Sequence, residues 1–526
     1  MTGLGTSKRR AADDSGAAER GRGWRARPPE NWMDGPAALA ARAGAALTPA
    51  ALWRNHRLFT VTALVSVLPR LVAALGFRPA LLIQDSFSYM AEANHLTPLS
   101  QLRPAGYPLL LWVLKPLHSL LLVTTLQHLM GIALAAIIYG VLRTRGLPAW
   151  GATLAAAPTL FDSREIWMES SILPDTLFTL VLMIAVAILI VAPALTIGQA
   201  AAVGVLVSWA SVIRGNGAPV FVVILVFLLV RRVGWRVVTA CVAAFAVPLL
   251  GYTLLFFSEY GQFDITNSTG MFLWSRTMSF ANCAVIKPPA DLVPLCPQNQ
   301  PDHPAGPAPA WSVSALLDER TPAQYLWAAG AWYSVDSHPG INAYNNSLAM
   351  KFAERAIEAQ PLAYARTVGE GVLLTFVGTD RSDSYLTLHF TPTPYIPALG
   401  RTIERYEEQY AHTGSNTRAV QPWAYLMLLY QEPVWFPGVV FLLVMAAGLA
   451  GLIRRWRRGN SCAGLAWSVA LVNLVVPVAA HEMDYRYAIS AVPFACLALG
   501  LVLAREPDPE AVAGRAAPED QDPPTG

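Results

Sequence analysis

The stretch LFTVTALVSVLPRLVAALGF, residues 58–77, decides the fold class of this chain. Its only charged residue is Arg70, and it is as long as the roughly 20 helical residues that cross a bilayer core. Charge is also scarce in the whole sequence, where 14% of 526 residues are charged and 54% are hydrophobic. Soluble domains carry roughly 25% charged residues. The stretch therefore predicts a membrane-spanning helix.

Nine further apolar runs predict an all-α polytopic membrane protein with ten transmembrane helices. The expected spans lie near 58–77, 118–142, 147–162, 172–192, 197–213, 217–231, 236–257, 434–454, 462–480 and 487–504. With a cytoplasmic N-terminus, Arg143, Arg145 and the clusters RRVGWR and RRWRRGN all fall in cytoplasmic connections. The positive charges thus predict a multi-pass protein of the plasma membrane with both termini in the cytoplasm.

The segments between and beyond the spans complete the domain organisation. A basic tail over 1–57 and an acidic tail over 505–526 are expected to be disordered. The spans over 58–257 include a first outer loop at 78–117, and 434–504 holds the last three spans. The segment 258–433 is too long for a simple connection, so it predicts a mainly helical extracytoplasmic insert, with amphipathic helices over 342–372.

Two of the five cysteines lie together in this insert. Cys283 and Cys296 are expected to form a disulfide if the insert faces an oxidising compartment. The other three lie in apolar runs, where a buried hydrophobic role is typical. No spacing of Cys and His typical of a zinc site occurs, and nothing in the composition indicates nucleic acid as a partner.

Acids and arginines gather at the outer ends of the predicted spans. Charge at a membrane rim is costly and usually functional. A carboxylate can accept the proton of an acceptor hydroxyl, and arginines can hold a phosphate as it leaves. The residues that we single out are Arg70, Asp85, Tyr89, Arg103, Glu169, Asp175, Arg214 and Arg486.

Several of these residues also have a purely structural interpretation. Asp85 would suit a helix N-cap, and Glu169 and Asp175 would suit loop solvation or the cap of the fourth span. Arg486 would serve as an interfacial anchor, and Arg70 would form an ion pair with an outer-loop acid. We expect the neighbouring Glu92 to be a solvated loop residue.

These motifs resemble those of the GT-C superfamily of membrane glycosyltransferases, in its protein O-mannosyltransferase and aminoarabinose transferase branch. The likeness rests on the late arginine of the first span and on QDSFSY, RPAGYPLLL, MESSILPDTLF and DYRYAISAVP. It covers most of 58–257 and 434–504. The resemblance implies a GT-C-like fold and an inverting transfer of a sugar from a polyprenyl-phosphate donor on the extracytoplasmic face.

The resemblance also implies roles for single residues. Asp85 matches the acid that acts as the catalytic base or binds the acceptor side. The basic residues that bind the lipid phosphate are matched by Arg70, Arg103, Arg214 and Arg486. Tyr89, Glu169 and Asp175 would position the acceptor or the arginines. Several relatives carry paired acids at the loop opening, whereas Ser86 follows Asp85, so a divalent metal is compatible with the sequence but not indicated, and no cofactor follows with certainty.

Two other classes of function are compatible with the sequence. A lipid or polysaccharide transporter would place charges along a path through the bilayer, and an inactive relative would serve as a scaffold. The concentration of charge at one rim favours the enzyme. The acceptor, a glycan, a lipid or a protein of the envelope, does not follow from the sequence.

Overall fold

The computed structural model describes residues 49–95, 101–300, 322–335, 338–377, 388–391, 400–412, 417–455 and 461–504. The chain divides after Arg57 into two units. Of the first unit only the opening of the first described helix is described, and the second unit, which begins at Leu58, contains all the other described elements. The acidic tail over 505–526 and most of the basic tail lie outside the described residues.

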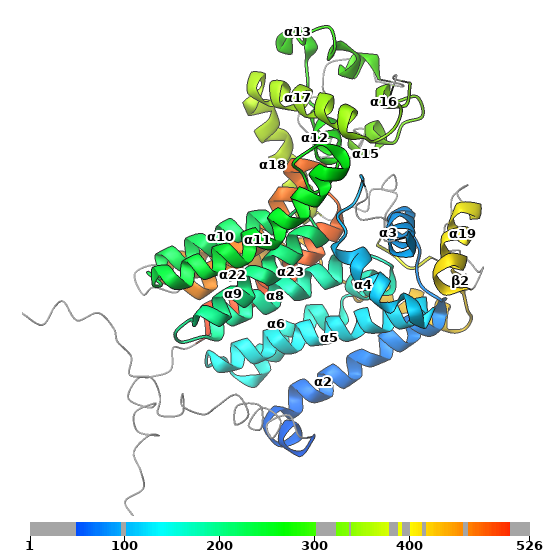
Figure 1. Cartoon of the computed structure of the whole chain (residues 1–526). Helices are drawn as coiled ribbons and strands as arrows, with labels where there is room; N and C mark the ends of the chain where they lie inside the picture. Colours follow the sequence, from blue (N-terminus) through cyan, green and yellow to red (C-terminus); the bar gives the residue numbers. More distant parts are fainter. Residues whose placement is uncertain are drawn as a thin grey trace, which may run out of the picture. The chain divides into compact units, whose positions relative to one another are not determined.

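A helix lies at each of the ten predicted spans (Figure 1). These helices are α2 (Pro49–Gly76), α5 (Leu120–Thr144), α6 (Ala149–Phe161), α8 (Asp175–Val191), α9 (Ile197–Ile213), α10 (Gly217–Val230), α11 (Trp235–Tyr260), α21 (Gly438–Arg455), α22 (Ser461–Ala480) and α23 (Tyr485–Leu503). Among the described residues, five helices have the length and composition to cross a membrane, namely α2 from His56, α5, α11, α22 and α23. The helices α8, α9, α10 and α21 are also apolar but shorter. The protein is therefore mainly helical, with several candidate membrane spans.

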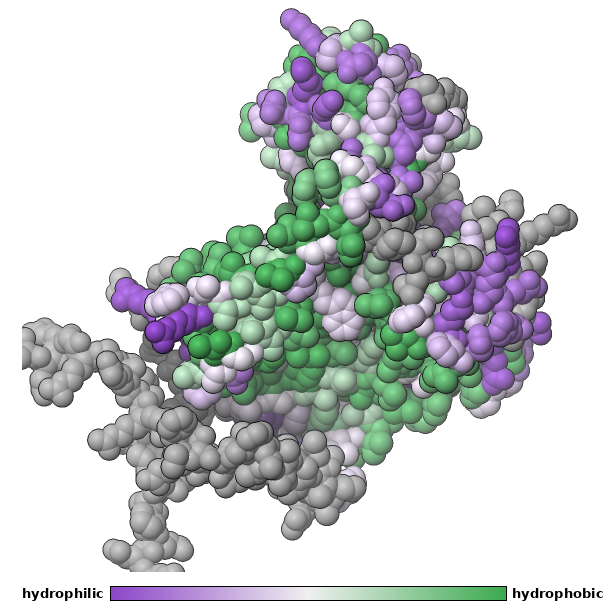
Figure 2. All heavy atoms as spheres, viewed as in Figure 1, coloured by the Kyte–Doolittle hydropathy of each residue, from purple (hydrophilic) through white to green (hydrophobic). Residues whose placement is uncertain are grey.

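Burial separates an inner helix from outer ones. In the most apolar window of α23, 83% of the residues are buried inside the protein, against 17% in α2 and 11% in α11. Large apolar side chains on the outer helices are exposed, among them Leu64, Leu68, Val247 and Leu255, and Figure 2 shows hydrophobic residues spread over the helical bundle. Soluble proteins rarely expose such continuous apolar surface, so it is the surface that a bilayer would cover.

Shorter elements connect these helices and form the parts beyond them. They are β1 (Phe77–Arg78), α3 (Gln84–His95), α4 (Gly106–Leu114), η2 (Lys115–Leu117), α7 (Ser163–Ser170), α12 (Thr269–Thr277), α13 (Cys283–Ile286), η3 (Val293–Leu295), η4 (Pro297–Asn299), α15 (Pro322–Leu326), α16 (Trp332–Val335), α17 (Ala343–Ala359), α18 (Pro361–Val377), α19 (Gly400–Ala411), β2 (Arg418–Ala419) and α20 (Trp423–Gln431).

The first part of the predicted insert has a hydrophobic core of its own. Trp274, Trp332 and Phe352 are buried together in it. The expected disulfide between Cys283 and Cys296 is present, with Cα atoms 6.1 Å apart. The helices α17 and α18 confirm the helical prediction for 342–372.

The last part of the insert packs instead against the first outer loop. β1 pairs antiparallel with β2, with Phe77 opposite Ala419, and α19 packs on α3. The Tyr410 hydroxyl donates a hydrogen bond to the Leu111 carbonyl at 2.7 Å. The single insert predicted over 258–433 therefore has two parts, of which the second belongs with the first loop.

Candidate functional site

Asp85 lies in the first turn of α3, and the backbone before it is fixed in place. The Leu81 amide donates to the Ser170 carbonyl at 2.8 Å, and the Ile172 amide donates to the Leu81 carbonyl at 3.2 Å. The Ser86 hydroxyl donates to the Ile172 carbonyl at 3.1 Å and accepts from the Ile83 amide. The predicted first outer loop and the predicted second outer loop, residues 161–177, are thereby joined where α3 begins.

The Asp85 carboxylate bridges two arginines from distant parts of the chain. Its Oδ1 pairs with Arg103, which follows α3, and its Oδ2 accepts from Arg486 Nη1 at 2.9 Å. The side chain of Asp85 is 16% exposed. Burial by itself would raise the pKa of Asp85, but the guanidinium groups of Arg103 and Arg486 outweigh burial and hold this pKa at about 2.

Arg486 is held at the start of α23 by the residue that caps this helix. Asp484 Oδ1 accepts from the Arg486 amide at 2.9 Å, and Asp484 Oδ2 accepts from Arg486 Nε at 3.0 Å. Arg486 therefore binds one carboxylate at its Nε and another at its Nη1. This fixed double contact is more than the loose interfacial anchor that its position in the sequence also allowed.

Arg103 lies against the beginning of the insert. Its guanidinium carbon is 5.9 Å from the ring centroid of Phe272 in α12. The Asn267 amide donates to the Gln101 carbonyl at 2.7 Å, and the Ser268 hydroxyl donates to the Leu102 carbonyl at 3.0 Å. The insert thus packs against the segment that carries Arg103.

Arg214 and Asp175 form a second ion pair near the first. Asp175, the first residue of α8, is fully buried and pairs with Arg214, which ends α9. The Arg214 guanidinium also lies over the Tyr487 ring at 4.8 Å, and Tyr487 follows Arg486 in α23. Arg214 is close enough to Asp85 to lower its pKa. The structure therefore brings Asp85, Arg103, Arg214 and Arg486 together.

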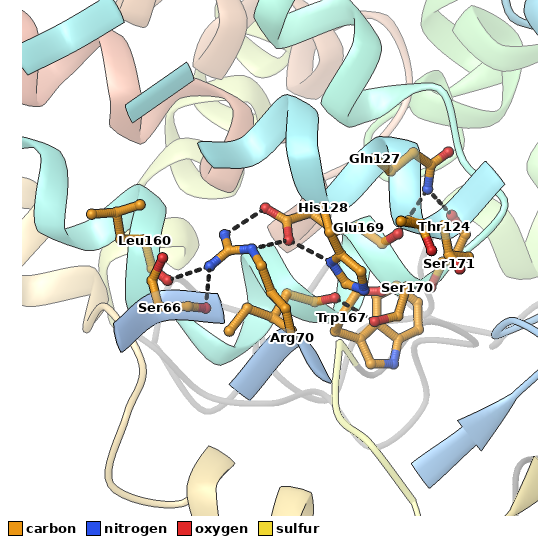
Figure 3. A network of polar contacts seen from close by, with 12 residues as sticks. Ser66, Arg70, Thr124, Gln127, His128, Leu160, Trp167, Glu169, Ser170 and Ser171 are labelled. Atoms are coloured by element: carbon orange, nitrogen blue, oxygen red, sulfur yellow. Dashed lines mark hydrogen bonds and ion pairs between the residues drawn. The ribbon is translucent and has the colours of Figure 1, made fainter. Parts of the chain in front are cut away.

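Arg70 and Glu169 belong to a separate buried network (Figure 3). Arg70 Nε and Nη2 donate to the two Glu169 carboxylate oxygens at 2.8 and 2.7 Å. The remaining donors of Arg70 bind the carbonyls of Ser66, Leu160 and Thr159. These bonds use all five guanidinium N–H groups, and Arg70 is only 2% exposed. Arg70 has no donor left for a lipid phosphate, which corrects its predicted role and matches the structural alternative of an ion pair.

Two polar residues of α5 complete this network. His128 Nδ1 lies 2.8 Å from Glu169 Oε2, and Gln127 Nε2 donates to the carbonyls of Glu169 and Ser171. The Tyr107 hydroxyl donates to Gln127 Oε1 at 2.7 Å. The sequence motifs missed both residues, although a Gln and a His inside an apolar run are a signal of an interior contact.

Tyr89 joins the two groups of residues by packing. Its buried ring meets the Tyr107 ring edge to face, with centroids 5.3 Å apart. Tyr89 lies one helical turn after Asp85 in α3. It therefore supports the face of α3 that carries Asp85.

Glu92 is not the solvated loop residue that we expected. Its side chain is 8% exposed and lies on α3, within a segment that the motifs treated as a loop. Only with α3 as a helix does the spacing of Asp85 and Glu92, seven residues apart, place both on one face. The sequence motifs, which we interpreted as a loop, did not indicate this shared helical face.

Within the described residues, no group of three or more His, Cys, Asp or Glu side chains is arranged to hold a metal ion. Comparison with protein-family models, with curated proteins and with solved structures finds no match to this chain. The geometry of the site and the motifs that form it are therefore the grounds for assigning a function.

Proposed function

We propose that this protein is an inverting membrane glycosyltransferase of the GT-C type that moves a sugar from a polyprenyl-phosphate donor to an envelope acceptor. The observation that carries this proposal is the Asp85 carboxylate held between Arg103 and Arg486. A carboxylate and several guanidinium groups at one place are the groups needed to accept a proton and to hold a departing phosphate.

In this mechanism the donor phosphate competes with Asp85 for its arginines. With a pKa of about 2, Asp85 is a weak base while both guanidinium groups hold it. A phosphate that binds Arg103, Arg486 and Arg214 takes donors from Asp85, and the pKa of Asp85 then rises toward its ordinary range. Donor binding would thus activate the base.

The transfer itself breaks one bond and forms another. The acceptor oxygen attacks the anomeric carbon, its proton passes to Asp85, and the bond from that carbon to the phosphate oxygen breaks. The electron pair of the broken bond stays on the phosphate, where the arginines stabilise the added charge. Asp484 and Asp175 position Arg486 and Arg214 through their ion pairs.

The proposal includes the full topology of ten spans, with both termini in the cytoplasm and the site on the extracytoplasmic face of the plasma membrane. In support of it, the four predicted outer connections that carry Asp85, Glu169, Arg214 and Arg486 are linked by direct contacts or by shared neighbours. The insert lies against Arg103 through Phe272 and would help to select the acceptor.

Sugar transfer in washed membranes tests this function. A labelled polyprenyl-phosphate hexose is supplied with endogenous acceptors, and wild type is compared with Asp85→Asn and with Asp291→Asn at matched expression. Asp291 is exposed, and its substitution makes the same chemical change outside the site. We expect a loss of about 100-fold or more for Asp85→Asn, the usual effect of removing a general base, and no change for Asp291→Asn.

Full transfer by Asp85→Asn would overturn the proposed role of Asp85. Absence of transfer by wild type over several donor sugars would count against the enzyme and favour a transporter or a scaffold.

A further inference from the structure

Glu92 is a buried acid without a hydrogen-bond partner in the part of the chain that the structure describes. Its side chain is 8% exposed, and neither of its carboxyl oxygens has a hydrogen-bond partner among the described residues. Buried polar groups are almost always paired, because leaving one unpaired costs free energy. An unpaired buried carboxyl beside a candidate site therefore points to a ligand that would supply the missing hydrogen-bond partner.

The position of Glu92 points to the same site as Asp85. Asp85, Tyr89 and Glu92 are spaced by four and three residues in α3, so they share one face of this helix. Arg103, the partner of Asp85, is close enough to lower the pKa of Glu92. Glu92 therefore lies on the side of α3 where the proposed phosphate site is.

The protonation state of Glu92 decides what it can bind. Burial raises its pKa to about 9, against an opposing effect of Arg103. At neutral pH the carboxyl is protonated and has an O–H group to donate. An ionised carboxylate would repel a phosphate, whereas a neutral carboxylic acid can donate a hydrogen bond to it.

We propose that Glu92 is a second carboxyl of the substrate site and donates a hydrogen bond to a phosphate oxygen of the lipid donor beside Arg103. This inference rests on the proposed function. As the sugar leaves, charge grows on the phosphate, and the hydrogen bond from the Glu92 O–H group to the phosphate strengthens while the proton stays on Glu92. Asp85 and Glu92 thereby have opposite tasks, one as a carboxylate and the other as a neutral acid.

Other titratable groups lie on the elements near α3. They are Tyr107 of α4, Glu407 and Tyr410 of α19, Lys115 of η2, Tyr252 and Tyr260 of α11, and Arg103. Arg103 opposes the effect of burial on the pKa of Glu92. The Tyr252 hydroxyl accepts a hydrogen bond from the Ala105 amide at 3.2 Å, which places α11 beside the segment that carries Arg103.

Lipid binding by the purified full-length protein in detergent micelles tests the role of Glu92. Decaprenyl phosphate is the probe, decaprenol without phosphate is the control lipid, and the midpoint of ligand-induced thermal stabilisation gives the affinity. The variants are Glu92→Gln, Glu92→Leu and the exposed control Glu354→Gln. A glutamine keeps an N–H donor without charge, whereas leucine keeps the bulk and has no donor.

We expect Glu92→Gln and Glu354→Gln to bind within about threefold of wild type and Glu92→Leu to bind about tenfold more weakly, the loss for one hydrogen bond to a charged group. Wild-type affinity in Glu92→Leu would overturn the proposal. So would equal losses in Glu92→Gln and Glu92→Leu, because an uncharged N–H donor would then give no advantage over leucine.

One further variant separates a failure of this inference from a failure of the proposed function. Arg486→Gln removes a phosphate ligand that the function itself requires. If Arg486→Gln binds weakly and Glu92→Leu binds normally, only the role of Glu92 fails. If wild type does not distinguish decaprenyl phosphate from decaprenol, the phosphate site fails, and the role of Glu92 fails with it. Melting temperatures without lipid show that each variant is folded.

Discussion

At the residue scale, the shared carboxylate of Asp85 is the central feature. Each of its oxygens binds a different guanidinium group, and Arg486 is in turn fixed by Asp484. Such a group is ionised at all ordinary pH values, so it keeps the two arginines in place. Preorganised charge of this kind is a common source of transition-state stabilisation.

Glu92 predicts a pH dependence of stability with a definite sign. Its pKa is about 9 in the folded protein, above the ordinary 4.5. Its contribution to stability is therefore fully present below pH 4.5 and is lost as the pH rises toward 9. The loss from this one group is at most about 1.4 kcal/mol per pH unit. Asp85 has a lowered pKa and stays ionised between pH 4.5 and pH 9, so its contribution to stability does not change over this range.

The melting temperature of wild type and Glu92→Gln, measured in detergent from about pH 5 to about pH 9, checks this prediction. Other acids titrate in both proteins, so the difference between the two curves isolates Glu92. We expect Glu92→Gln to gain stability relative to wild type as the pH rises. A constant difference over the whole range would contradict a buried protonated acid.

The residues of the site were predictable from the sequence, but their pairing was not. Charged residues at a membrane rim are costly and are usually functional. This criterion identified Asp85, Arg103, Arg214 and Arg486. Arg70 met the same criterion and yet lies in another network, with Glu169. The depth of an arginine along a span does not reveal which loop carries its ion-pair partner. The partner depends on how the helices pack.

At the scale of elements, α5 and α7 approach closely around the Glu169 carboxylate. Gly131 of α5 allows this approach, because a Cβ at this position would overlap that carboxylate and lie 3.3 Å from Arg70 Nη2. The helix α7 carries Glu169 between α6 and α8 and bonds to the loop before α3. The buried network therefore supports the set of contacts that places Asp85.

Gly131→Ala should destabilise the protein and Gly140→Ala should not. The new methyl group in Gly131→Ala displaces Glu169 from Arg70, and a broken buried ion pair costs about 3–5 kcal/mol. Gly140 lies on the same helix with no atom within 4 Å of an added Cβ, so it is a matched control. Melting temperatures in detergent measure the effect, and equal stability of the two variants would contradict the network.

The elements outside the bundle were harder to predict than the helices within it. The length of the apolar runs predicted ten spans, and a described helix lies at each of them. We predicted a loop where α3 lies because its sequence, QDSFSYMAEANH, is rich in polar residues and lacks a clear apolar periodicity. Its position depends on contacts with the second outer loop and with α19, which local sequence does not encode.

At the scale of the whole chain, distant segments meet around one site. Residues near 85, 103, 175, 214 and 486 lie together, although hundreds of positions separate the first from the last. The insert that appeared as one unit has a disulfide-linked part with its own core and a part that pairs with β1. The boundary between these parts lacked a compositional signal, because both contain helices and prolines.

The fate of the lipid donor tests the central claim most directly. The purified protein is reconstituted into liposomes with a labelled polyprenyl-phosphate hexose and membrane-derived acceptors, and the lipid products are separated. We predict that wild type releases polyprenyl phosphate without its sugar while the label enters an acceptor, and that Asp85→Asn does not. Movement of the intact sugar-bearing lipid to the other leaflet, with no polyprenyl phosphate released, would contradict a glycosyltransferase and indicate a transporter.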